Sequence, residues 1–150
     1  MTYDLAGAAV TTLTPGEIDA DSIMDGASWF HFTGITPALG PAPLETLGSL
    51  LAAAGRAGVM VSCDLNFRKK LWTTEQAQRT MTPLMKRVDV CIANEEDAEK
   101  CLGVGASHSD VDAGEIDEAA YADLAVRLRD RFGFSTVAIT LRESYSASRN

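Results

Sequence analysis

The sequence predicts an α/β fold with a mostly parallel sheet and helices on both faces, in three layers. Four short apolar runs are spaced along the chain as buried strands would be, and stretches with helical spacing separate them. Each strand is thus followed by a helical crossover, the connection that parallel strands require. With 150 residues, the chain fits one domain and can bury roughly 70% of its unfolded surface.

The first elements follow a turn at Pro15-Gly16. Residues 19–25 are predicted to form a short acidic helix, and Trp29–Thr33 to form a strand that is apolar on both faces and therefore buried. His31 lies in this strand. A lone histidine in an apolar strand is more often a hydrogen-bonded core residue than a catalyst, so we leave it out of the candidate site.

The next crossover is a helix over about residues 42–56, predicted by leucines and alanines at helical spacing. Gly58 ends this helix, and a buried strand begins at Val59.

A second crossover helix begins after Thr73, which forms a possible capping box with Gln76. Pro83 lies inside this helix, where its ring predicts a kink or a restart. Val88–Ala93 is the third predicted strand.

The last two elements follow a polar surface loop over residues 103–117. An apolar stripe at helical spacing predicts a helix that ends at Gly133, and Ser135–Leu141 is predicted to be the fourth strand.

Polar side chains follow the second strand, where the chain changes from apolar to basic. If the backbone stays extended, Asp64, Asn66 and Arg68 project to one side, and Phe67 to the other. They would then line the carboxyl edge of the sheet, where open α/β sheets bind ligands.

Arg68 begins the densest positive cluster of an otherwise acidic chain, continued by Lys69 and Lys70. Because a guanidinium matches a carboxylate or phosphate, this cluster favours a small anionic ligand. The alternative is a loop that only caps the next helix and whose lysines are solvated, and the spacing does not decide between the two.

Asn94 follows the third strand and precedes three carboxylates in the first turn of a predicted helix. An asparagine cap with acidic residues behind it complements the helix dipole, which explains this composition without a ligand.

Composition excludes some classes of partner and suggests a compartment. The net charge of -8 argues against nucleic acid and against an anionic membrane surface. No signal peptide or apolar run of membrane-spanning length is visible. The three cysteines, Cys63, Cys91 and Cys101, are predicted to be buried free thiols, which favours a cytoplasmic protein.

Several of these stretches carry a family resemblance. Asp64–Trp72 resembles the Asp-x-Asn-x-Arg-x-Lys-Leu-Trp segment of 2-dehydro-3-deoxygluconate kinases, which are ribokinase-like (PfkB) carbohydrate kinases. Trp29–Ile35, Val90–Ala98 and Val137–Leu141 resemble further segments in the same order. The resemblance implies an incomplete ribokinase-like fold, with residues 1–150 as a partial, central part of the kinase domain.

The resemblance also implies a reaction and a set of ligands. The parent kinase would phosphorylate 2-dehydro-3-deoxygluconate or a related sugar, with ATP and Mg²⁺ as cofactors. Tyr3, Asn66 and Arg68 match positions that contact the sugar acid. Positions on the nucleotide side are matched by Asn94, Asp97 and Thr140.

Three positions depart from the family pattern, and each changes a group in or near the implied site. Leu5 replaces an arginine beside Tyr3, Asp97 replaces a glutamate, and Arg142 replaces a glycine. The loss of the arginine removes one positive charge from the implied sugar-acid site.

The family's catalytic base is the aspartate of a Gly-Ala-Gly-Asp motif, and no Gly-x-Gly-Asp occurs in residues 1–150. We therefore expect the chain alone to be inactive, and its cut sheet edges to favour association, with a homo-oligomer as one outcome. The alternative hypothesis is a non-catalytic α/β module that binds a small anion or regulates another protein.

Overall fold

The computed structural model describes residues 8–106 and 118–141 of the chain. They form a four-stranded parallel sheet in the order β1-β2-β3-β4. The strands are β1 (Trp29–Thr33), β2 (Met60–Asp64), β3 (Val90–Ala93) and β4 (Thr136–Ile139). Three of the strands lie within their predicted ranges, and β2 begins one residue after its predicted start at Val59. The prediction of a parallel α/β sheet is confirmed.

The helices are α1 (Ala20–Met24), α2 (Ile35–Ala38), α3 (Pro41–Ala57), α4 (Thr74–Leu84), α5 (Glu95–Leu102) and α6 (Glu118–Phe132). Short 3₁₀ turns lie at Ala9–Thr11, Pro15–Glu17 and Met85–Arg87. The sequence analysis predicted no helix between Trp29–Thr33 and residues 42–56, where α2 lies with Pro37 inside it. Pro83 lies one residue before the end of α4, where the chain tightens into the 3₁₀ turn.

The predicted helix ends are confirmed by their caps. Gly58 ends α3 with a left-handed φ of 68°. Thr73 and Gln76 form the reciprocal bonds of a capping box at the start of α4. Such local devices are encoded by a few neighbouring residues, which is why the sequence predicts them well.

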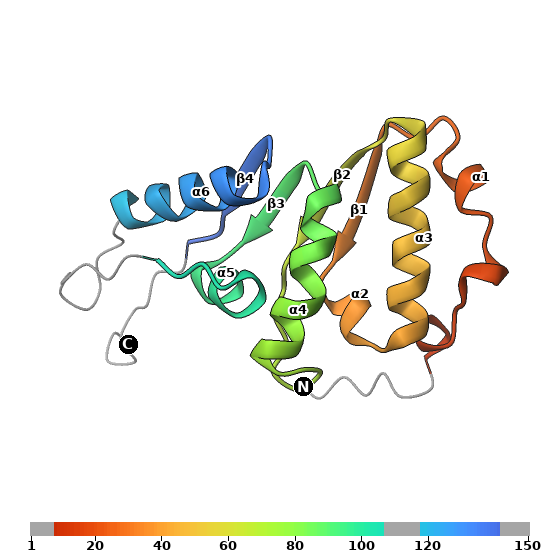
Figure 1. The fold of residues 1–150 in the computed structure, drawn as a ribbon, viewed down its shortest axis with the longest axis horizontal. Coiled ribbons are helices and arrows are strands. Elements are labelled where there is room, and N and C mark those ends of the chain that lie inside the picture. Colours follow the sequence, from red (N-terminus) through yellow and green to blue (C-terminus); the bar gives the residue numbers. More distant parts are fainter. Residues whose placement is uncertain (1–7, 107–117, 142–150) are drawn as a thin grey trace, which may run out of the picture.

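One face of the sheet packs against helices and forms the core. Figure 1 shows α4 in front of β2 and α3 running alongside β1. The core joins this face of the strands to the apolar stripes of the helices, and it includes Phe32, Val61, Cys63, Cys91, Leu47, Leu51, Met81, Leu124 and Leu128. All three cysteines are buried free thiols, as predicted.

The opposite face of the sheet is largely exposed in the described residues. Trp29 and Met60 are neighbours on this face, and their exposed fractions are 53% and 42%. The expectation that Trp29–Thr33 is buried on both faces is therefore wrong. His31 is hydrogen-bonded as expected, through Nδ1 to the Ser62 hydroxyl at 2.7 Å, but it lies on the exposed face rather than in the core. The described residues thus supply the sheet and one of the two predicted helical layers.

The backbone turns sharply after β2, and it does not stay extended as the sequence analysis assumed. Asn66 has a φ of 42°, the only positive φ of a residue other than glycine in the described part of the chain. Asparagine tolerates this left-handed conformation better than most residues because its short polar side chain can bond locally. Strict alternation of side chains therefore ends at Asn66.

Candidate functional site

The carboxyl ends of the strands border a cavity of about 570 Å³. Its lining comes from the loop after β2, the end of β3, the first turn of α5 and the residue after β4. The lining residues are Asp64, Asn66, Phe67, Arg68, Lys69, Lys70, Ile92, Asn94, Glu96, Asp97 and Thr140. We call this the strand-end cavity.

The positive side chains of the strand-end cavity are available to a ligand. Arg68, Lys69 and Lys70 are exposed, and none of them forms an ion pair with another described residue. Asn66 comes from the same loop, and its side-chain amide donates to the Thr33 hydroxyl at 3.3 Å. The loop thus presents three cations beside a fixed amide, which suits a small hydroxylated anion.

The first turn of α5 contributes two buried polar groups to the cavity. Asn94 caps the helix by accepting the Asp97 N–H at 2.8 Å, so its predicted structural role is confirmed. Asp97 itself accepts the backbone N–H of Phe67 at 3.0 Å. This bond joins the helix to the loop after β2, across 30 residues of sequence.

Burial raises the pKa of the Asp97 carboxyl above its ordinary value of 3.8. The nearby charges of Asp64 and Glu96 raise this pKa further, whereas hydrogen bonds from the backbone of Phe67 and of Asn94 to the carboxyl oppose the shift. Asp97 as a whole is only 9% exposed, so the ionised form of its carboxyl is costly at this position.

Thr140 follows β4, which is separated from β2 by β3 in the sheet, and it also lines the cavity. Its backbone N–H donates to the Ala93 carbonyl at 2.8 Å, and its hydroxyl contacts the same oxygen at 3.4 Å. This pairing fixes Thr140 beside the end of β3, next to Asn94.

Five of the six predicted site residues line this one cavity: Asn66, Arg68, Asn94, Asp97 and Thr140. The sixth, Tyr3, lies outside the described residues, as do the departures Leu5 and Arg142. Sequence reasoning missed Ile92 and placed Phe67 on the opposite side, because it assumed an extended backbone through Asn66. The positive φ of Asn66 has no clear sequence signal.

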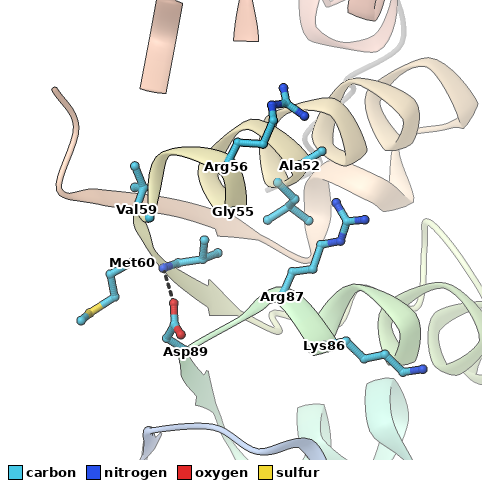
Figure 2. A pocket seen from close by; sticks show the side chains of 11 residues that line it. Ala52, Gly55, Arg56, Val59, Met60, Lys86, Arg87 and Asp89 are labelled. Atoms are coloured by element: carbon cyan, nitrogen blue, oxygen red, sulfur yellow. Dashed lines mark hydrogen bonds between the residues drawn. The ribbon is translucent and has the colours of Figure 1, made fainter. Parts of the chain in front are cut away.

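A larger cavity, of about 680 Å³, lies at the amino ends of the strands. Figure 2 shows that Arg56 and Arg87 extend to one side of it, whereas Lys86 extends away from them. Arg56 is paired with Asp21 at 2.6 Å, and a carboxylate oxygen of Asp89 accepts the Val61 N–H at 2.8 Å (Figure 2). Because Arg56 and Asp89 are paired and parallel sheets bind ligands at the other edge, we do not place the site here.

The described residues add two further observations about ligands and membranes. No group of three or more His, Cys, Asp or Glu side chains among them is arranged to hold a metal ion. None of the described helices combines the length and the hydrophobicity that crossing a bilayer demands.

Comparisons with known proteins find similar sequences and folds among sugar-acid kinases. The chain is 38% identical over 148 residues to the 2-dehydro-3-deoxygalactonokinase of Haloferax volcanii, covering 99% of this chain and 42% of that protein. It is 47% identical to the crystal structure of a 2-dehydro-3-deoxygluconokinase from Thermotoga maritima, with a TM-score of 0.82 over 91% of this chain and 40% of that one.

A third similarity is to a PfkB family carbohydrate kinase from Listeria grayi. The identity is 28% and the TM-score 0.68, covering 88% of this chain and 38% of that one. No protein-family profile matches the chain. The chain spans about two fifths of the length of these relatives, at 42%, 40% and 38%. In sequence and in fold, the chain is similar to a segment of PfkB carbohydrate kinases and of the 2-dehydro-3-deoxy sugar-acid kinases among these relatives.

Proposed function

We propose that this chain is the segment of a sugar-acid kinase that holds part of the substrate and part of the nucleotide. The parent reaction is the ATP-dependent phosphorylation of 2-dehydro-3-deoxygluconate or a related sugar acid. The observation that carries the proposal is the strand-end cavity, which gathers a basic loop, an asparagine cap and Thr140 at one edge of the sheet. Relatives that act on two such sugar acids support the substrate class.

On the sugar side, Arg68 binds the carboxylate of the substrate through its planar guanidinium. Asn66 offers its amide to substrate hydroxyl groups, with Thr33 holding the amide in place. Tyr3 remains part of this proposal by its family position alone. The family arginine beside it is Leu5 here, so Arg68 carries more of the recognition of the substrate's charge.

On the nucleotide side, Asn94 and Thr140 face the phosphates of ATP. Mg²⁺ is usually bound by one or two carboxylates together with substrate phosphates, and it keeps several waters. The carboxylates of α5 fit that pattern better than they fit a closed protein cage, since no cluster of three such ligands is present in the described residues. When bound, the ion would offset the negative charge of the transferred phosphate.

Transfer to a sugar hydroxyl also needs a base, and the Gly-x-Gly-Asp motif that would supply it does not occur in residues 1–150. The chain by itself therefore binds without turning over, and a cytoplasmic location fits its three free thiols. Neither nucleic acid nor membrane is among the proposed partners.

The sharpest test replaces the matching segment of the Thermotoga kinase with this chain. We expect the chimera to form ADP from ATP only when 2-dehydro-3-deoxygluconate or its galactonate epimer is present, and the 150-residue chain alone to form none. Comparing the two epimers identifies the preferred sugar. A folded chimera without sugar-dependent ADP formation would contradict the proposal, and so would turnover by the chain alone.

A calorimetric titration of the chain alone separates the kinase segment from a general anion module. The sugar acid should bind more tightly than inorganic phosphate or the neutral sugar 2-deoxyglucose. Equal affinity for phosphate and for the sugar acid would instead favour the non-catalytic module.

A further inference from the structure

The turn after β2 is held residue by residue, each time by a different part of the fold. The Asp64 carbonyl accepts the Gly34 N–H at 2.8 Å, and the Leu65 N–H donates to the Ile92 carbonyl at 3.0 Å. The Asn66 amide reaches Thr33 on β1. These bonds fix the chain up to the residue with positive φ, a conformation that costs energy and persists only where surrounding structure determines it.

The next restraint is a single side chain. Phe67 donates its backbone N–H to Asp97, at 3.0 Å, and Arg68 follows immediately. Asp97 is in turn fixed by Asn94, which accepts its N–H at 2.8 Å. One carboxylate thus connects the cap of α5 to the loop that carries the cavity's cations.

We propose that Asp97 is a positioning residue that holds the turn after β2 against α5 and thereby sets where Arg68 stands in the strand-end cavity. This role differs from the magnesium role that the family position implies, because it needs an oxygen acceptor rather than a negative charge. The proposal relies on the proposed function only for the identity of the ligand. The link between helix and turn is a property of the fold itself.

Two substitutions separate the roles. Asp97→Asn keeps an acceptor oxygen and removes the charge, whereas Asp97→Ala removes both. Positioning predicts that the Phe67 amide exchanges with solvent about tenfold faster in the alanine variant and at the wild-type rate in the asparagine variant. Glu96→Gln is the matched control, since it removes a carboxylate from the same helical turn without touching the Phe67 bond.

Ligand binding gives the second readout, with 2-dehydro-3-deoxygluconate as the probe for the full chain. We expect Asp97→Ala to weaken binding about tenfold and Asp97→Asn to bind as the wild type does. If asparagine behaves like alanine in both measurements, the charge matters and the proposal fails. It also fails if alanine leaves Phe67 exchange unchanged.

The two proposals can fail separately. Faster Phe67 exchange in Asp97→Ala, together with a wild type that ignores the sugar acid, supports the positioning role and overturns the proposed function. If Asp97→Ala does not fold, Asp97→Asn still tests the proposal. The positioning role requires that Asp97→Asn folds and protects the Phe67 amide from exchange, and the proposal fails if it does not.

Discussion

At the scale of single residues, Arg68 is the side chain on which the proposed specificity depends. It is exposed, unpaired among described residues and placed in the strand-end cavity. Hydrogen bonds to charged groups contribute about 1.5–3 kcal/mol, so Arg68→Ala should weaken sugar-acid binding by about 10- to 100-fold. The affinity of Arg68→Lys should fall between those of the wild type and Arg68→Ala, since lysine keeps the charge and loses the bidentate geometry. Titration calorimetry measures all three affinities, and an unchanged alanine variant would remove Arg68 from the site.

Asp97 makes a prediction about pH and stability. Its pKa is raised in the folded chain from the ordinary 3.8, so the folded state binds the proton more tightly than the unfolded state does. The stability that the protonated carboxyl contributes is fully present below the unfolded pKa of 3.8, and it is lost as pH rises through the higher pKa of the folded chain. Wild type should therefore lose stability relative to Asp97→Asn as the pH rises above the ordinary pKa of 3.8.

Denaturant unfolding of both proteins at several pH values measures this difference. Asp64, Glu96 and the Cys101 thiol surround the carboxyl and are common to both proteins, so their own effects largely cancel. A wild type that gains stability relative to the asparagine variant as pH rises would contradict the raised pKa.

Gly34 packs directly beneath the turn. A Cβ atom at this position would overlap the backbone oxygen of Leu65. Overpacking of this kind costs about 1–3 kcal/mol, so Gly34→Ala should destabilise the chain and displace the turn. Gly48 in α3 has no atom within 4 Å of its added Cβ, and Gly48→Ala should instead stabilise by about 0.5–1 kcal/mol. Thermal unfolding of the pair tests the prediction, which is wrong if both variants shift in the same direction.

At the scale of elements, the capping box of α4 orients the helix that follows the cavity loop. Thr73 accepts the Gln76 N–H at 3.3 Å, and the Gln76 side chain accepts the Thr73 N–H at 2.8 Å. Thr73→Ala should therefore cost about 1 kcal/mol of unfolding free energy. Thr74→Ala, one residue into the helix, should be neutral or slightly stabilising because alanine is the better helix former. Chemical denaturation that found equal losses would show that the cap is unimportant.

The elements also show which structure can be predicted from sequence. Strands, and the helix ends and caps that were predicted, follow from neighbouring residues and agree with the structure within a residue or two, whereas α2 was missed. The Phe67–Asp97 bond and the turn at Asn66 were not predicted, because they depend on groups about 30 residues apart that meet only when the sheet forms. Five of the predicted site residues line one cavity for a related reason: parallel strands bring their carboxyl ends to one edge.

At the scale of the whole molecule, the described residues leave much of one sheet face exposed. A chain of hydrogen bonds crosses this face: the Trp29 indole N–H donates to the Ser62 hydroxyl at 2.8 Å, and that hydroxyl contacts His31. The sequence pattern could not show whether a second helical layer is present in these residues. An apolar strand such as Trp29–Thr33 has the same pattern whether helices cover one face of the sheet or both. Trp29 and Met60 place an exposed apolar pair at one end of this face, on an acidic protein.

The exposed face and the outer edges of the sheet lead to a prediction about association. Within the described residues, β1 and β4 each pair on one side only, and Met60 stands beside Trp29 at one end of the open face. We expect the weight-average mass of the chain to rise with concentration in sedimentation equilibrium, because burying this surface is favourable.

Met60→Lys should reduce the association by placing a charge in the interface. Val126→Lys on α6 is the matched control, since valine there is 44% exposed and methionine 42%, and both changes add the same charge. If the two variants lower association equally, net charge and not the sheet face drives it, whereas a wild type that stays monomeric at high concentration excludes the interface altogether.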